Sequence, residues 1–463
     1  MASNKKYWQS VEELKDSSIV ETLSKNEFVE EIPTDEFLGD KKTLENSSTS
    51  RRDFLKYVGF TTAAATMAAC EGPVKKSIPY VVKPNDTILG VADWYASTIA
   101  DGFDFANVLV KTREGRPILI MPNKDANGTT NARVQAAVLS LYDEQLRLKE
   151  PRKGEQTISW NTAHNEIGAA LAQLKEANQP VVLLTGTLAS PSTAQIISEF
   201  TTAYPNVKHV AYDAISESGT ADAFEAMFGE RAIPNYHFEK AHTIVSFGAD
   251  FIGDWQGGFE KGYAASRNPD SGHMSYLVQF EANMSLTGAN ADKRVALKPS
   301  QQKIALAKLY GKLVGTAVGG ELPAHLETAV NSAASELLKA GANAVVLTGI
   351  QDVNAQNIVL AINEKLGSKA FDPKTTLKTR QGNDKAVAQL VADMTAGKVG
   401  AILMAGVNPA YTLPNASAFV EGLKQTELSV AFTMKNDETA SVSQYVAAAP
   451  HYLESWGDLE TKK

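Results

Sequence analysis

Short runs of consecutive apolar residues recur along the chain from about residue 180 onward, and helical patterns separate them. A short apolar run that ends in glycine or in a polar turn is typical of a strand buried on both faces. Because helices join these strands, we expect α/β architecture, with parallel sheets covered by helices on both faces. The expected strands span residues 180–186, 207–212, 243–247, 276–280, 344–349, 401–404 and 428–432.

A different pattern precedes these strands. Two apolar segments, 108–112 and 117–121, flank a polar turn, and Gly115 is expected to occupy that turn in a β-hairpin. Apolar residues then recur at helical spacing, which predicts a helix over residues 132–148. Together these elements predict a small α+β domain.

The patterns predict three folded domains behind an N-terminal leader. Strand 344–349 repeats the pattern of residues 181–186, which reflects either two similar Rossmann-like units or the ordinary composition of buried strands. Polar residues 367–384 are expected to form a connecting loop, and Ser190-Pro191 to begin a helix. The expected divisions are a leader at 1–69, a small α+β domain at 70–155, and Rossmann-like α/β domains at 156–320 and 321–463.

Composition narrows the class of protein. The chain has 463 residues, of which 43% are hydrophobic and 21% charged, as in soluble multi-domain proteins. The formal charge of −8 argues against a broad basic face for nucleic acid, so no nucleic-acid partner is expected. No apolar stretch is long enough to predict a membrane-spanning helix.

The N-terminal region carries an export pattern. Arg51 and Arg52 precede an uncharged, alanine-rich stretch that ends at Cys70. Paired arginines before such a stretch are typical of twin-arginine signals, and a cysteine after small residues is typical of lipoprotein processing. We therefore expect export and a lipid-anchored mature chain that begins at Cys70, on the periplasmic face of the inner membrane. The alternative is an amphipathic surface helix with a small buried cysteine.

Candidate chemistry is sparse. Cys70 is the single cysteine, so the chain alone cannot form an internal disulfide, a four-thiolate zinc site or an iron–sulfur cluster. The seven histidines form no metal-binding motif, and no metal site is expected. Asp250 and Asp254 could pair for acid–base chemistry, or could simply cap a loop. Gly406, Asn408 and Pro409 follow a strand, where they form either a ligand-binding loop or a tight turn.

Several segments resemble the molybdopterin oxidoreductase family, in particular the large subunit of alternative complex III, a quinol-oxidising respiratory complex. The resemblance covers nearly the whole chain, and its segments follow the family's order. The long leader, with its twin arginines, also resembles the extended leaders of that family. The segments are VKTREGRP at 110–117, GADFIGDW at 248–255, TGANAD at 287–292, GVNPAYTL at 406–413 and HYLESWGD at 451–458.

Departures from the family pattern decide what the resemblance implies about cofactors. Family members often bind an iron–sulfur cluster and molybdenum through cysteines, and this chain has none after Cys70. Where the family's dinucleotide loop reads Pro-Gly-Thr-Asp, residues 299–302 read Pro-Ser-Gln-Gln. The resemblance therefore implies an emptied cofactor site, with molybdopterin unlikely and iron–sulfur clusters expected only in sequence beyond residue 463. The vestigial cofactor-loop candidates are Asp250, Asp292, Gly406, Asn408 and Pro409.

The function implied by the resemblance is that of a noncatalytic scaffold in a membrane-anchored, quinol-oxidising complex. Its expected partners are a multihaem cytochrome, iron–sulfur subunits and polytopic quinol-binding membrane subunits. Two alternatives stay open: an active molybdopterin enzyme with a non-thiolate metal ligand near Asp250, and a periplasmic ligand-binding lipoprotein.

Overall fold

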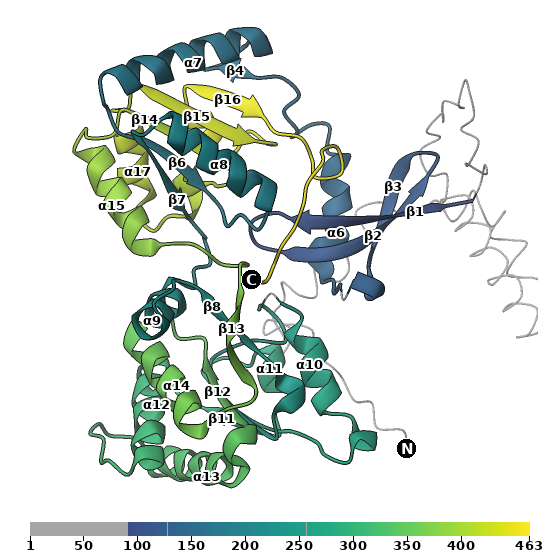
Figure 1. Ribbon diagram of the computed structural model, residues 1–463, viewed down its shortest axis with the longest axis vertical. Helices are drawn as coiled ribbons and strands as arrows, with labels where there is room; N and C mark the ends of the chain where they lie inside the picture. Colours follow the sequence, from purple (N-terminus) through teal and green to yellow (C-terminus); the bar gives the residue numbers. More distant parts are fainter. Residues whose placement is uncertain (1–90, 127, 256) are drawn as a thin grey trace, which may run out of the picture. The chain divides into compact units, whose positions relative to one another are not determined.

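The computed structural model describes residues 91–463, except residues 127 and 256 (Figure 1). The expectations for Arg51, Arg52 and Cys70 therefore lie outside the described residues. Within the described part, the strands form a three-stranded, a four-stranded, a two-stranded and a seven-stranded sheet. No helix of this part is long and apolar enough to cross a membrane.

The three-stranded sheet and one helix form the N-terminal domain, as the hairpin pattern predicts. Glu114 and Gly115 both have positive φ, which is the geometry that a tight hairpin turn requires. Alternate residues such as Val108 and Val110 point toward the helix, so one face of the sheet is buried against it. The elements are β1 (Asp93–Ala100), β2 (Phe105–Arg113), β3 (Arg116–Pro122) and α6 (Ala132–Leu141).

Helix α6 is shorter than the predicted 132–148. The chain leaves the helix after Leu141, and the backbone N–H of Leu148 donates to the carbonyl of Met434 at 2.7 Å. The backbones of Arg147 and Lys435 also pair in an isolated antiparallel β-bridge. Pairing with a segment distant in sequence therefore competes with continuation of the helix, and residue spacing alone does not reveal such pairing.

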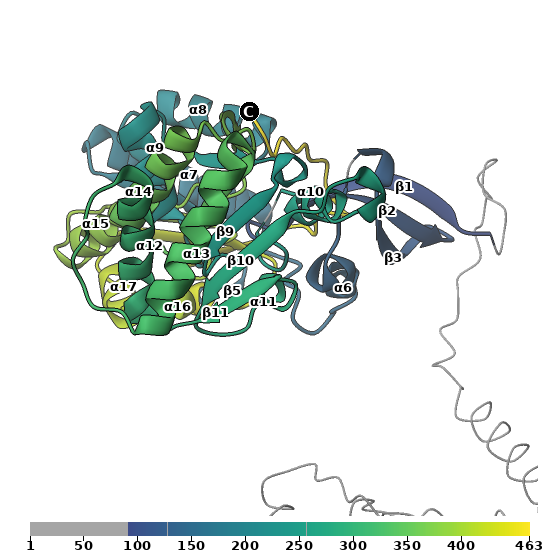
Figure 2. The same cartoon turned by 90° about the horizontal axis from the view of Figure 1, so that it is seen from below.

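The four-stranded sheet is parallel, in the order β11-β10-β9-β12. Successive residues of β9 enter different cores: Val245 packs with α12 and α13, and Ile244 with α9 and α10. Helices therefore cover both faces (Figure 2). The elements are α9 (Ser218–Phe228), β9 (Thr243–Phe247), α10 (Phe259–Ser266), β10 (Tyr276–Glu281), α11 (Leu286–Ala289), β11 (Lys293–Ala296), α12 (Pro299–Val314), α13 (Ala324–Ala340), β12 (Ala344–Thr348) and α14 (Val353–Leu366).

The seven-stranded sheet has the order β5-β4-β16-β15-β14-β6-β7, and its last five strands are parallel. Helices α15 and α17 pack on one face, and α7 and α8 on the other. Ser190 caps α8 and Pro191 is its first residue, as predicted. The elements are β4 (Arg152–Lys153), β5 (Gln156–Thr157), α7 (Trp160–Glu176), β6 (Val181–Thr185), α8 (Pro191–Ala203), β7 (Val207–Ala211), α15 (Asp384–Thr395), β14 (Ala401–Ala405), α16 (Pro409–Thr412), α17 (Ala416–Leu423), β15 (Leu428–Thr433), α18 (Glu438–Val442) and β16 (Tyr445–Ala448).

Strand pairing divides the chain differently from the predicted 156–320 and 321–463. Strand β6 pairs with β14, and β12 pairs with β9, so each of the two larger sheets crosses the predicted boundary. The seven-stranded domain is built from residues 152–213 and 379–448, and the four-stranded domain lies between them in sequence. Strands of similar composition can pair in either sheet, so their apolar pattern does not indicate their partners.

The prediction of a loop over residues 367–384 is wrong for part of that range. Strand β13 (Phe371–Leu377) pairs antiparallel with β8 (Ile233–Tyr236), with a register shift between Asp372 and Leu377. Pro373 and the charged residues around it hide this strand from the apolar pattern, because an irregular edge strand tolerates both.

Candidate functional site

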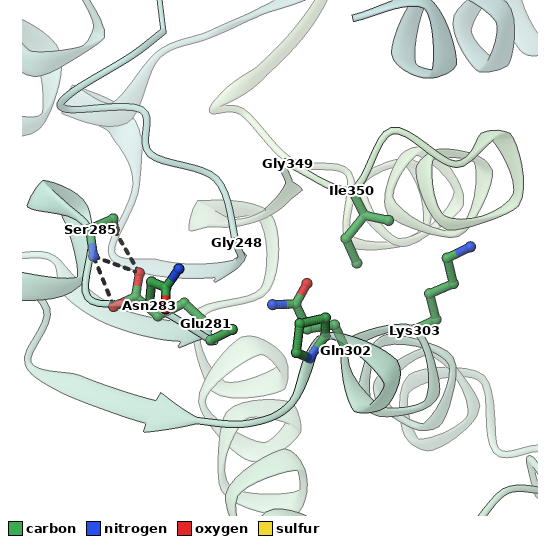
Figure 3. Close-up of a pocket in the computed structure, with 10 residues that line it drawn as sticks. Gly248, Glu281, Asn283, Ser285, Gln302, Lys303, Gly349 and Ile350 are labelled. Carbon is green, nitrogen blue, oxygen red and sulfur yellow. Dashed lines mark hydrogen bonds between the residues drawn. The ribbon is translucent and has the colours of Figure 1, made fainter. Parts of the chain in front are cut away.

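A cavity of about 430 Å³ lies at the carboxyl ends of β9, β10 and β12 (Figure 3). Ligands of α/β proteins bind at this edge, because strand ends and helix N-termini meet there. Its lining includes Gly248 and Gly349 at strand ends, Glu281 and Ser285 after β10, and Gln302 and Lys303 of α12.

Gly248 presents its backbone to the cavity, and Gln302 lies against it. Gly248 has φ +68°, and a Cβ at this position would lie 3.4 Å from Gln302 Oε1. The carboxamide of Gln302 thus occupies the space in which a ligand would approach the glycine backbone (Figure 3). The residues that replace Pro-Gly-Thr-Asp therefore place a side chain into the cavity.

The buried carboxylate of the cavity belongs to Glu281, and neighbouring side chains of the chain donate hydrogen bonds to it. The residue is 3% exposed, and its oxygens accept from Arg294 Nε at 2.5 Å, Ser285 Oγ at 2.6 Å and Gln279 Nε2 at 3.2 Å. Burial alone would raise the pKa of Glu281, but the hydrogen bonds from Ser285, Arg294 and Gln279 outweigh it and lower the pKa. Its charge is therefore compensated internally.

Lys303 is the cation that lines the cavity, and it is paired as well. Its Nζ lies 2.7 Å from Asp352 Oδ2, and Asp352 Oδ1 caps α14 by accepting from the N–H of Ala355 at 3.0 Å. The hydrogen bond from Lys303 is the largest contribution that lowers the pKa of Asp352. This ion pair joins α12 to α14 at the surface.

Two of the three predicted aspartates, Asp250 and Asp292, lie at opposite edges of the four-stranded sheet, and the third, Asp254, donates its backbone N–H to the carbonyl of Asp250 at 2.8 Å. Asp250 follows β9 at the carboxyl edge, where its Oδ1 accepts from the N–H and the hydroxyl of Thr287 at 2.8 and 2.7 Å. Asp292 precedes β11 at the amino edge, and it pairs with Arg267 at 2.9 Å. They form no common site, and the loop-capping interpretation of Asp250 is the one that fits.

The carboxyl edge of the seven-stranded sheet holds the other predicted loop. Asn408 Oδ1 accepts from the N–H and the hydroxyl of Thr439 at 3.1 and 2.7 Å, and its amide donates to Glu438 at 2.7 Å. Pro409 begins the four-residue helix α16. The amide of Asn408 thus joins α16 to α18, and the tight-turn interpretation fits the observed contacts.

A loop of the N-terminal domain reaches the same edge. A Cβ at Gly186 would lie 3.6 Å from the carbonyl oxygen of Gly406 and 3.8 Å from the Cα of Gly102. Gly406 itself has φ +65°, which explains the glycine at this position. Backbone segments of two domains therefore lie in van der Waals contact at the ends of β6 and β14.

Arginine side chains enclose this contact. The guanidinium groups of Arg380 and Arg133 lie 4.4 and 4.9 Å from the ring centroid of Phe103. Arg380 also donates to the carbonyl of Phe103 at 2.9 Å, and Arg133 pairs with buried Asp104 at 2.8 Å. Sequence reasoning missed this cluster, because Arg380 lies in a stretch predicted as a loop and no motif marks it.

Two acidic residues lie where the chain crosses between the larger domains. Asp213 accepts from the hydroxyl of Thr187 at 2.7 Å and from the backbone N–H groups of Gln381 and Gly382 at 3.0 and 2.8 Å. Burial raises the pKa of Glu217 to about 7, against an opposing effect of Arg380. The two segments that connect the larger domains, near Asp213 and near Gln381, are therefore held together by hydrogen bonds to the carboxylate of Asp213.

A smaller cavity of about 300 Å³ lies beside the start of α8. His209 on its wall has Nε2 2.8 Å from Thr185 Oγ1, and burial lowers the pKa of His209. Lys378, another wall residue, forms an ion pair with Glu460. The polar groups of this cavity are thus largely engaged with one another.

These crevices do not fit a pterin dinucleotide as they stand. Such a ligand needs donors or cations for its phosphates and open backbone at the strand ends. Among the described residues that line the larger cavity, Lys303 is paired with Asp352, Glu281 accepts from Arg294, and Gly248 is covered by Gln302. Within the described chain, no group of three or more His, Cys, Asp and Glu side chains is arranged to hold a metal ion.

A protein of known structure has a similar fold. No protein-family model matches the chain. Acetylene hydratase from Pelobacter acetylenicus has a similar structure, with a TM-score of 0.54 and 15% identity, over 78% of this chain and 61% of that one. The expected fold class is confirmed: the chain has an α/β fold with parallel sheets, and this fold matches the structure of acetylene hydratase.

A curated protein is distantly related in sequence. The chain is 24% identical, over 473 residues, to the "menaquinone reductase, molybdopterin-binding-like subunit" of Nitratidesulfovibrio vulgaris (strain Hildenborough). The match covers 89% of this chain and 67% of that protein. The chain is thus distantly similar in sequence to this molybdopterin-binding-like subunit.

Proposed function

We propose that the chain is a noncatalytic structural subunit of a membrane-anchored, quinol-oxidising electron-transfer complex. Its distant relative is named as the molybdopterin-binding-like subunit of a menaquinone reductase, which supports a role in a quinone-linked complex. In this role the chain has no activity of its own, and it holds the redox-active subunits in register.

The observation that carries this proposal is the way in which the chain fills its own ligand edge. Gln302 covers Gly248 in the four-stranded domain, and Arg380 and Arg133 enclose Phe103 at the seven-stranded domain. A cofactor-dependent enzyme keeps such positions open for its ligand, whereas a scaffold gains stability by closing them.

The remaining parts of the proposal rest on the sequence. Arg51 and Arg52 would direct export, and a lipid on Cys70 would anchor the chain at the periplasmic face of the inner membrane. Partners would be a multihaem cytochrome, iron–sulfur subunits and polytopic quinol-binding subunits. Molybdopterin would be absent from this chain.

Filling the larger cavity tests the proposal. The variant Gln302→Trp places a bulky ring in the space of a dinucleotide, and it is expressed in a host strain that lacks the native chain. We expect quinol-dependent electron transfer by its membranes to stay within about twofold of wild type, because no cofactor is displaced.

Assembly of the complex and the melting temperature of the variant are the controls. Loss of electron transfer from a fully assembled complex of normal stability would show that a bound cofactor is needed, and would overturn the noncatalytic assignment.

A further inference from the structure

One face of the N-terminal sheet has an apolar surface that the described chain leaves exposed. The other face, with Val108, Val110 and Ile120, packs on α6. Because side chains alternate along a strand, the residues between these inward positions point outward. An antiparallel sheet with one solvated face usually carries polar residues there.

Strand register defines this outer face as two rows across the sheet. In one row Trp94 pairs with Lys111, which pairs with Leu119, and in the next row Ala96 pairs with Leu109, which pairs with Met121. Exposed fractions are 48% for Trp94, 39% for Leu119 and 41% for Met121. These six residues are referred to below as the outer face.

Lys111 provides the cation within the outer face. Its Nζ lies 5.6 Å from the centroid of the Trp94 ring, and it stands between Trp94 and Leu119 in the row. The outer face thus combines a tryptophan, a methionine and leucines with one central positive charge. Tryptophan and methionine are enriched in protein interfaces, and contiguous exposed apolar patches mark interaction sites.

We propose that the outer face docks a partner subunit whose contact surface is apolar and presents a carboxylate to Lys111. This inference rests on the proposed function, because it requires a complex. A symmetric contact with a second copy would bring two Lys111 side chains together, which is repulsive.

Site-specific photo-cross-linking tests the docking surface. A benzoylphenylalanine replaces exposed Ala96 in the full chain, expressed in its own host, and a second version carries the same group at exposed Ser335 on α13. We expect the probe at position 96 to cross-link one subunit that co-purifies with the wild-type chain, and the probe at position 335 not to reach that subunit.

Charge reversal tests the role of the lysine. We expect Lys111→Glu to weaken retention of the cross-linked subunit by about tenfold or more, and Lys339→Glu on exposed α13 to leave it unchanged. The melting temperature of Lys111→Glu should stay at the wild-type value, because the side chain points away from the core.

The outcomes distinguish failure of the docking surface from failure of the proposed function. Cross-links from position 96 to a second copy, to lipid, to residues 1–90 of the same chain, or to nothing in an intact complex would overturn the docking surface and leave the proposed function standing. A wild-type chain that co-purifies with no other subunit would overturn both.

Discussion

Glu281 illustrates how a single residue can close a ligand site. Its carboxylate is buried and accepts from Arg294, Ser285 and Gln279. A buried charge is tolerated only when the protein supplies the partners that water would otherwise provide. With these partners in place, the carboxylate stabilises the end of β10 instead of binding a ligand.

Replacement of Arg294 should show how far the buried carboxylate of Glu281 depends on its partners. We expect Arg294→Met to lower the free energy of unfolding by about 1–3 kcal/mol, because the carboxylate of Glu281 stays buried without its cation. The double variant Arg294→Met/Glu281→Gln should recover much of the loss. Urea unfolding at pH 7 measures both, and equal losses in the two variants would contradict the pairing argument.

Glu217 makes stability depend on pH in the opposite direction from an ordinary ion pair. Its pKa is raised from 4.5 to about 7, so its neutral form fits the folded state. A raised carboxyl pKa means that the contribution is fully present below pH 4.5 and is lost as the pH rises through 7.

The variant Glu217→Gln should therefore raise stability at alkaline pH. We expect a gain of about 1–3 kcal/mol at pH 8 and little change at about pH 4, below the unfolded pKa of 4.5, because glutamine carries no charge to bury. Melting temperature across this range measures the difference, with exposed Glu225→Gln as the charge-matched control. A gain that is independent of pH would contradict the assignment.

At the scale of elements, short helices at the ligand edge are held by side chains. Asn408 joins α16 and α18 through Thr439 and Glu438. A four- or five-residue helix is too short to be stable by itself, so these contacts fix the ends of β14 and β15.

Loss of the amide should loosen both helices. We expect Asn408→Ala to cost about 1–2 kcal/mol, since it leaves the N–H of Thr439 without an acceptor. Tyr411→Ala, on the exposed surface of α16, serves as the matched control and should change little. Similar losses in the two variants would show that the amide does not join the helices.

Sequence pattern predicts the strands of this molecule better than their arrangement. The apolar runs 181–185, 243–247 and 401–405 form strands because both faces of each are buried. Which strands pair with one another depends on how the connecting helices pack on the faces of the sheets, and residue periodicity does not encode that packing. Asp250 and Asn408 were predicted as site candidates on position alone, and local hydrogen bonds engage both.

For the whole molecule, the central feature is the fixed junction between domains. Asp213 binds both crossing segments, and Arg380 reaches from the crossing to the N-terminal domain. Asp213 thus ties the two connecting segments to each other within the seven-stranded domain, and Arg380 ties one of them to the N-terminal domain.

Removing the buried guanidinium should loosen the junction without unfolding the domains. We expect Arg380→Met to speed hydrogen exchange in residues 101–104 while the strands of both larger sheets stay protected. Arg116→Met, on the exposed hairpin, is the matched control. Unchanged exchange in Arg380→Met would show that this arginine does not hold the loop.

For the whole chain, we propose that an α/β fold similar to that of acetylene hydratase is kept with its ligand edge closed. The most direct test is molybdenum and pterin analysis of the full chain, purified in its complex from its own host. We expect no molybdenum above the buffer level and no guanine nucleotide released on acid hydrolysis. Stoichiometric molybdenum together with a pterin guanine dinucleotide would contradict the account.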